Sequence, residues 1–149
     1  MVQGIVELER RSGWRSRFAA EMDRQRRMGF EWGSHDCFSG LVVGAVRAIT
    51  GEDIGAGFRG RYNDEAGAQA VLAADGFADL GDLVASLLPT REHPSQARLG
   101  DVGLIPAPGL LGSALCVFDS GTLIVLTARG HGRAARELAF RAFRVGDEV

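Results

Sequence analysis

The spacing of apolar residues changes halfway along the chain, and this change limits the fold more than any other feature. Up to about Leu88 apolar residues recur at helical spacing, whereas beyond Gly100 they alternate as in strands. We expect helices over 13–27, 37–51, 64–76 and 80–88. We expect strands in DVGLIP (101–106), SALCVFD (113–119), TLIVLTA (122–128) and ELAFRAFRV (137–145). Helices followed by a meandering antiparallel sheet make an α+β fold, and 149 residues suit a single domain.

The predicted helix from Cys37 to its glycine stop at Gly51 is apolar on nearly all sides, in FSGLVVGAVRAITG (38–51). A helix of this kind is buried, so we expect it to pack on one face of the sheet. Ser34 or Asp36 is the expected N-cap. The first helix is expected to be capped by Ser12 and to bury Trp14, Phe18 and Met22, and the third to turn Ala66, Ala70, Val71 and Ala74 inward.

Two turns are expected in the second half of the chain. Ser-Gly in FDSGTL (118–123) separates two apolar runs and predicts a hairpin. A second turn is expected in RGHGR (129–133), which places His131 in that turn, just past the third strand.

Cys37 stands at the start of the buried helix, within FEWGSHDCFSG (30–40). A helix N-terminus offers a positive dipole end and free N–H groups, which favour a thiolate and supply part of an oxyanion hole. A nucleophile of this type also needs a base, usually histidine, from another element. Asp36 acts against activation, because a neighbouring carboxylate raises a thiol pKa. The alternative is that Cys37 is a small core residue, as we expect for Cys116.

The segments WGSHDCFSG (32–40), LGDVGLI (99–105) and ALCVFDSGTLIVLTA (114–128) resemble the NlpC-type cysteine peptidases, a papain-like group that cuts peptidoglycan stem peptides. The resemblance implies an NlpC-like (papain-like) fold, with N-terminal helices followed by an antiparallel sheet packed on the Cys37 helix. It implies one domain over 1–149, with an N-terminal helical region (1–30), a helical half carrying Cys37 (31–90) and the sheet (99–146).

The whole layout is also similar to small phage and prophage proteins of unassigned activity that are encoded among tail genes. The similarity is carried by Trp14, FEWGSHDC (30–37), TGED (50–53), RGRY (59–62), GDV (100–102) and FRV (143–145). It implies a component of a phage-type tail tip or hub, made in the cytoplasm and incorporated into a virion or phage-like particle. Its partners would be other tail or hub proteins, with the arginine-rich N-terminal helix and the tail FRVGDEV (143–149) as assembly contacts.

The chain departs from the peptidase pattern where the catalytic base belongs. The aligned positions hold Ser113 or Ala114 in place of the base, and Val125 or Leu126 in place of the third polar residue. Residues 110–130 contain no histidine, so His131, or alternatively His35, is left as the base for Cys37.

Three functions therefore compete: a structural tail-tip protein with a degenerate peptidase fold, which we favour; an active peptidoglycan cysteine peptidase or amidase; and a module binding a small ligand or cell-wall peptide. In the last two, Trp32 and Tyr62 would form the rim of a cleft over Cys37, with Asp36 and Asp101 as further polar residues. For Asp36 the competing role is a helix cap, and for Asp101 a bond to loop N–H groups at a strand start.

Composition excludes other classes of function. The formal net charge of -2 gives no global field for nucleic acid, and no segment reaches the roughly 18 apolar residues of a membrane helix. The N-terminal sequence lacks the apolar region of a signal peptide. Two cysteines and three histidines show no metal-ligand spacing, so no metal or cofactor is expected. The arginines crowding residues 10–27 form either a solvated helix face or a docking face for an acidic partner.

Overall fold

A computed structural model describes residues 8–147, and residues 1–7 and 148–149 lie outside this description. The start of the predicted N-terminal region and the last two residues of the predicted contact tail therefore fall outside it. The helices are α1 (Trp14–Gln25), η1 (Cys37–Val42, a π-helix), α2 (Val43–Thr50), α3 (Glu65–Ala74), α4 (Leu80–Ala85) and the 3-10 turns η2 (Pro94–Gln96) and η3 (Arg136–Leu138). The strands are β1 (Val102–Pro106), β2 (Ser113–Phe118), β3 (Thr122–Thr127), β4 (Gly130–Ala135) and β5 (Arg141–Phe143).

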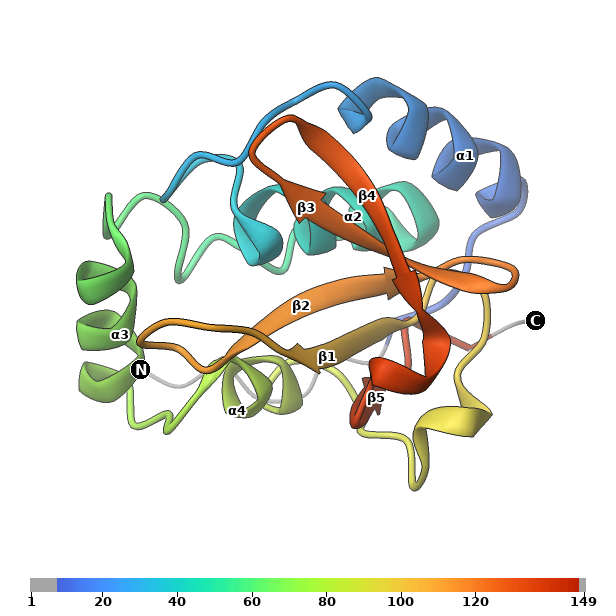
Figure 1. Ribbon diagram of the computed structural model, residues 1–149. Helices are drawn as coiled ribbons and strands as arrows, with labels where there is room; N and C mark the ends of the chain where they lie inside the picture. Colours follow the sequence, from blue (N-terminus) through green and yellow to red (C-terminus); the bar gives the residue numbers. More distant parts are fainter. Residues whose placement is uncertain (1–7, 148–149) are drawn as a thin grey trace.

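The five strands form one antiparallel sheet in the order β4-β3-β2-β1-β5, which confirms the α+β prediction (Figure 1). The first four strands meander along the chain, and β5 returns to pair with the free edge of β1. The hairpin predicted at Ser-Gly joins β2 to β3. None of the helices within residues 8–147 is long and apolar enough to cross a membrane.

The segment RGHGR was expected to be a turn, and this prediction is wrong for most of its length. The chain turns at Ala128 and Arg129, and Gly130 then begins β4, which pairs with β3 so that His131 lies opposite Leu126. Strand β4 is rich in glycine and alanine, which are poor strand formers. Its hydrogen bonds to β3 compensate for this low strand propensity. His131 is therefore a strand residue.

The main core lies between the helices and one face of the sheet. Side chains of α1, η1, α2, α3 and α4 pack there against alternate residues of β2, among them Leu115 and Val117. The intervening residues Cys116 and Phe118 point to the opposite face, into a smaller cluster with Ala97 and Ala142. Cys116 is fully buried, as expected of a core residue. The helix that starts at Cys37 thus packs against the sheet, as predicted.

The helix that begins at Cys37 opens with a π-helical turn, which the sequence does not predict. The Asp36 carbonyl accepts from Leu41 N at 3.2 Å as well as from Gly40 N at 3.0 Å, so one turn is wider than an α-helix. Turns of this kind are rare and occur often at functional sites. The helix continues as α2 and ends at Gly51, with φ 84°, as predicted from its glycine.

Candidate functional site

Asp36 is the N-cap of the helix that carries Cys37, one of the two caps that the sequence allowed. Its Oδ1 accepts from Phe38 N at 3.1 Å and from Ser39 N at 2.7 Å. Its Oδ2 accepts from Gly33 N at 3.0 Å and from the Tyr62 hydroxyl. Two N–H groups at the start of this helix, those of Phe38 and Ser39, are thereby bound to a carboxylate of the same chain and are not available to an oxyanion hole.

Tyr62 joins this cap from a distant loop. Its hydroxyl donates to Asp36 and lies 3.0 Å from Ser39 Oγ, and burial together with the Asp36 carboxylate raises the pKa of Tyr62. Its ring meets Trp32 at a centroid distance of 6.4 Å with the planes at 71°. Three of the residues predicted for a binding cleft, Trp32, Asp36 and Tyr62, are therefore assembled beside Cys37.

Gly33 allows the loop before Cys37 to lie directly against the segment that carries Tyr62. It has φ 86°, and a Cβ built on it would lie 2.2 Å from the Tyr62 carbonyl oxygen. Its own carbonyl accepts from Gly60 N at 3.1 Å. Both the left-handed backbone and the close approach require glycine here.

The Cys37 thiol is buried, and the pKa of Cys37 is raised to about 12. Burial is the main cause and the Asp36 carboxylate adds to it, in the direction that the sequence analysis expects. The amide of Leu115 on β2 acts in the opposite direction. Within residues 8–147, no hydrogen bond joins the Cys37 sulfur to a histidine ring.

The two histidines considered as bases for Cys37 have other neighbours. Nε2 of His131 lies 3.3 Å from Gln25 Oε1 on α1. His35 is buried with its ring over Gly40, where a Cβ would lie 2.2 Å from Nδ1, and its Nε2 has no hydrogen-bond partner among residues 8–147. At the position aligned with the peptidase base, Ser113 Oγ donates to the Leu111 carbonyl at 3.5 Å.

Both histidine rings have a lowered pKa. Burial is the largest cause for each; next come the Arg24 cation for His35, and for His131 the His35 ring followed by Arg133. The carboxylates Glu21, Glu31 and Asp36 oppose the shift at His35, and Glu21 opposes it at His131.

These lowered values predict that stability decreases as pH falls through the titration range of unfolded histidine, near 6.5. Below that pH the unfolded chain binds more protons than the folded one, so the free energy of unfolding falls by at most about 1.4 kcal/mol per pH unit per group. Urea unfolding of His35→Gln and His131→Gln between about pH 7 and pH 5 should show a shallower slope than wild type. His93→Gln, in an exposed loop, is the control. Equal slopes in all four proteins would contradict the prediction.

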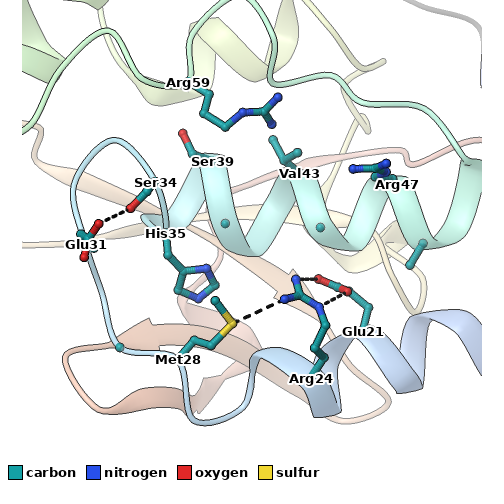
Figure 2. Close-up of a pocket in the computed structure, with 14 residues that line it drawn as sticks. Glu21, Arg24, Met28, Glu31, Ser34, His35, Ser39, Val43, Arg47 and Arg59 are labelled. Carbon is teal, nitrogen blue, oxygen red and sulfur yellow. Dashed lines mark hydrogen bonds and ion pairs between the residues drawn. The ribbon is translucent and has the colours of Figure 1, made fainter.

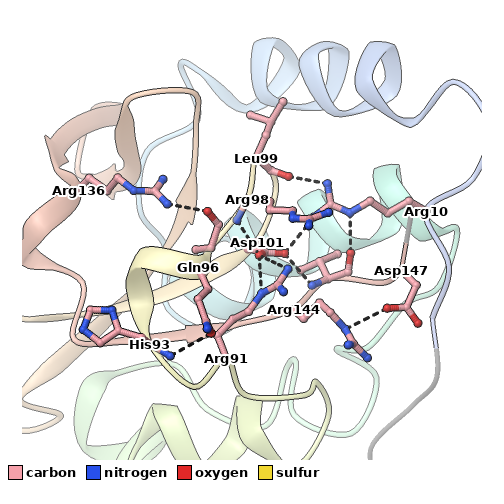
Figure 3. Close-up of polar contacts among 12 residues, drawn as sticks. Arg10, Arg91, His93, Gln96, Arg98, Leu99, Asp101, Arg136, Arg144 and Asp147 are labelled. Carbon is pink, nitrogen blue, oxygen red and sulfur yellow. Dashed lines mark hydrogen bonds and ion pairs between the residues drawn. The ribbon is translucent and has the colours of Figure 1, made fainter. Parts of the chain in front are cut away.

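Asp101 was included among the candidate binding residues, and it lies in a separate buried ion cluster (Figure 3). Its Oδ1 accepts from Arg10 Nη2 at 2.9 Å and Val145 N at 3.0 Å. Its Oδ2 accepts from Arg91 Nε at 3.1 Å and Nη2 at 2.9 Å, and from Arg98 N at 2.9 Å. The carboxylate thus joins the segment before α1, the loop before β1 and the C-terminal segment, a structural role.

Gln25 is a residue of this region that the sequence analysis missed. It is fully buried, and its Nε2 donates to Glu21 Oε2 at 2.6 Å and to the Gly40 carbonyl at 3.2 Å, while its Oε1 faces His131. A signal was available, because Gln25 continues the stripe of Trp14, Phe18 and Met22 at helical spacing. The amide connects α1 to both the Cys37 helix and β4.

The arrangement at Cys37 is therefore suited to holding the helix in place. The thiol is protonated at neutral pH because its pKa is about 12, and the N–H groups of Phe38 and Ser39 already bind Asp36. Within residues 8–147, no three His, Cys, Asp or Glu side chains converge in a way that would hold a metal ion.

A family model described as "Domain of unknown function (DUF6950)" matches residues 9–145, nearly the whole chain. A comparison with curated proteins finds no match.

Proposed function

The chain belongs to the DUF6950 family, and we propose that it is a structural component of a phage-type tail tip or hub, with an NlpC-like fold that has lost its catalytic dyad. In this role the protein is part of a virion or phage-like particle and contacts other tail proteins. Cys37 serves as a core residue at the start of a buried helix and does not act as a nucleophile.

One observation carries the non-catalytic part of the proposal: the Cys37 thiol is buried and has a raised pKa, to about 12. A cysteine nucleophile reacts as its thiolate, which requires a pKa near or below the working pH and a base within hydrogen-bond reach. Cys37 meets neither requirement in the part of the chain that the structure describes. The Asp36–Tyr62 hydrogen bond further stabilises the same helix start.

The tail-tip part of the proposal rests on the sequence pattern shared with proteins encoded among phage tail genes. The surface offers two kinds of contact for such an assembly. Arginines on the outer side of α1 and after it, such as Arg15 and Arg27, are exposed to solvent. Near the C-terminus, Leu138 and Phe140 are each 51% exposed, which is high for large apolar side chains.

The experiment is a complementation test in the phage or prophage that encodes the chain. Deletion of the gene should abolish infectious particles, and electron microscopy should show incomplete tails. A plasmid-borne Cys37→Ala protein should restore infectivity to within about twofold of wild type, because truncation of one small core residue is tolerated when the fold survives. Thermal unfolding of purified Cys37→Ala verifies that it folds. A folded Cys37→Ala protein that leaves infectivity at the deletion level would contradict the proposal.

A further inference from the structure

A groove of about 780 Å³ lies between α1 and the helix formed by η1 and α2, and the loop before Cys37 closes one end (Figure 2). Its volume is in the range of small-molecule sites. Glycines form part of its wall on the second helix: a Cβ on Gly40 would lie 2.2 Å from His35 Nδ1, and one on Gly44 would lie 2.2 Å from Gln25 Nε2. Cys37 is not among the lining residues, so the groove is distinct from the peptidase-like position.

Two of the three arginines that line the groove are neutralised within the protein. Arg24 makes a bidentate pair with Glu21 at 2.8 and 2.7 Å, and Arg59 makes one with Asp53 at 3.2 and 2.7 Å. Pairs of this geometry hold both partners in place and leave little net charge for a ligand. Arg24 and Arg59 therefore line the groove in fixed positions but offer no free charge to a ligand.

Two lining charges of opposite sign have no such partner among residues 8–147. Within residues 8–147 the exposed Arg47 side chain makes no hydrogen bond or ion pair, although its charge helps to lower the pKa of Asp53. Among residues 8–147 the Glu31 carboxylate has no cation within ion-pair distance and accepts only from Ser34 Oγ, at 2.6 Å. Figure 2 shows them at opposite ends, with Arg47 on α2 and Glu31 on the closing loop. The groove thus has a positive charge at one end and a negative charge at the other, and among residues 8–147 neither is held in an ion pair.

A buried polar atom without a partner lies between these ends. His35 is 8% exposed, and its Nε2 makes no hydrogen bond within the part of the chain that the structure describes. In Figure 2 its ring lies beside Met28 and Arg24, which are joined to each other by a hydrogen bond of 3.6 Å. Buried polar atoms are almost always satisfied, so an orphaned nitrogen on a residue that lines a groove indicates a position for a polar group of a ligand. The imidazole is neutral at pH 7, because burial lowers the pKa of His35.

The length of the groove limits what can connect the two charges. Ser39 and Arg47 both line it and are eight residues apart, which corresponds to about 12 Å along a helix. An extended chain of three or four residues spans roughly 10–14 Å. A single amino acid carries both charges on one carbon and is too short.

We propose that this groove binds an elongated zwitterion of the size of a free tri- or tetrapeptide. The ligand's carboxylate pairs with Arg47, its ammonium group pairs with Glu31, and a peptide group in between hydrogen-bonds to His35 Nε2. The proposal adds a ligand site to the structural role and does not depend on it, because purified protein suffices to test it.

Calorimetric titration with trialanine tests the proposal on wild type, Arg47→Gln and Glu31→Gln. Arg27→Gln is the matched control, since Arg27 is also exposed but does not line the groove. We expect at least about tenfold weaker binding of trialanine by Arg47→Gln and Glu31→Gln, and unchanged binding by Arg27→Gln. Single alanine should bind at least about tenfold more weakly than trialanine.

Peptides with one terminus chemically blocked test which charge of the ligand pairs with Glu31 and which with Arg47. N-acetyl-trialanine should bind wild type as weakly as trialanine binds Glu31→Gln, and trialanine amide should reproduce the loss of Arg47→Gln. The ¹⁵N resonance of His35 Nε2 should shift on saturation. Absence of trialanine binding to wild type at about 10 mM would overturn the proposal, as would equal binding by Arg47→Gln and Arg27→Gln.

Discussion

Replacing Asp101 by asparagine is expected to lower the free energy of unfolding by about 3–5 kcal/mol, the largest effect of any single substitution considered for this chain. The carboxylate is fully buried and accepts hydrogen bonds from Arg10, Arg91 and two backbone amides. The Arg10 side chain is only 2% exposed, so neutralising Asp101 removes the carboxylate that faces this buried cation. Breaking a buried pair on one side is costly for this reason.

The cluster also explains why one residue has so large an influence. Arg10 donates from Nε to the Val145 carbonyl at 2.9 Å and from Nη1 to the Leu99 carbonyl at 2.6 Å. The same guanidinium lies 4.3 Å from the centroid of the Trp14 ring. Loss of the Asp101 charge therefore loosens the attachment of α1, of the segment before β1 and of the C-terminal segment together.

Urea unfolding of a graded series tests this prediction. Asp119→Asn is the matched control, because Asp119 also pairs with an arginine, Arg133, but that side chain is 58% exposed; we expect a loss below about 1 kcal/mol. Arg91→Gln should fall between the two, since the Arg91 side chain is 19% exposed. If Asp101→Asn lost no more stability than Asp119→Asn, the cluster would not have the structural role assigned to it.

The regular elements follow from apolar spacing. The stripe of Trp14, Phe18 and Met22 predicts α1, and the alternating runs predict β1, β2 and β3 to within a residue or two. The stop at Gly51 and the hairpin at Ser-Gly are also confirmed, because glycine in these positions has few other roles. Local chemistry decides these elements, so a single sequence is sufficient to find them.

The errors occur where tertiary contacts decide the structure. Ser12 was expected to cap α1, but Gly13 is the N-cap and makes no side-chain cap. On α3 the inward face is Ala68 and Leu72, because the larger leucine determines which stripe is buried, and Ala66, Ala70 and Ala74 are exposed. The last strand is confined to β5, while 137–140 form a 3-10 turn and its exit. Strand β4 was missed because its hydrogen bonds to β3 offset a weak strand sequence.

The candidate site could be predicted only in part. The sequence indicates that Asp36 lies at the helix start beside Cys37, because cap positions are local. It does not indicate that Tyr62 donates to Asp36 or that His131 faces Gln25, since these pairs are separated by 26 and 106 residues. The partners of Asp101 are likewise distant: Arg10 is 91 residues away. The orphaned His35 nitrogen follows from packing against Gly40 and has no signature in the sequence.

The second large effect expected concerns the reactivity of Cys37. Its pKa of about 12 compares with an ordinary value of 9.0. At neutral pH the thiolate fraction is therefore about a thousandfold below that of a free cysteine, since each pH unit is a factor of ten. Burial additionally blocks access to the sulfur. Cys116, buried on the opposite face of β2 with a pKa also raised to about 12, is an internal control for a purely structural cysteine.

The most direct test of the claim that Cys37 is a core residue is its rate of alkylation by iodoacetamide at pH 7, measured by mass spectrometry of tryptic peptides. Cleavage after arginine separates Cys37 (peptide 28–47) from Cys116 (peptide 99–129). In the native protein both should react at least about a thousandfold more slowly than free cysteine, and in denaturing urea both should react at the rate of free cysteine. Native Cys37 reacting as fast as free cysteine or faster, with Cys116 still protected, would contradict the account and identify Cys37 as an activated nucleophile.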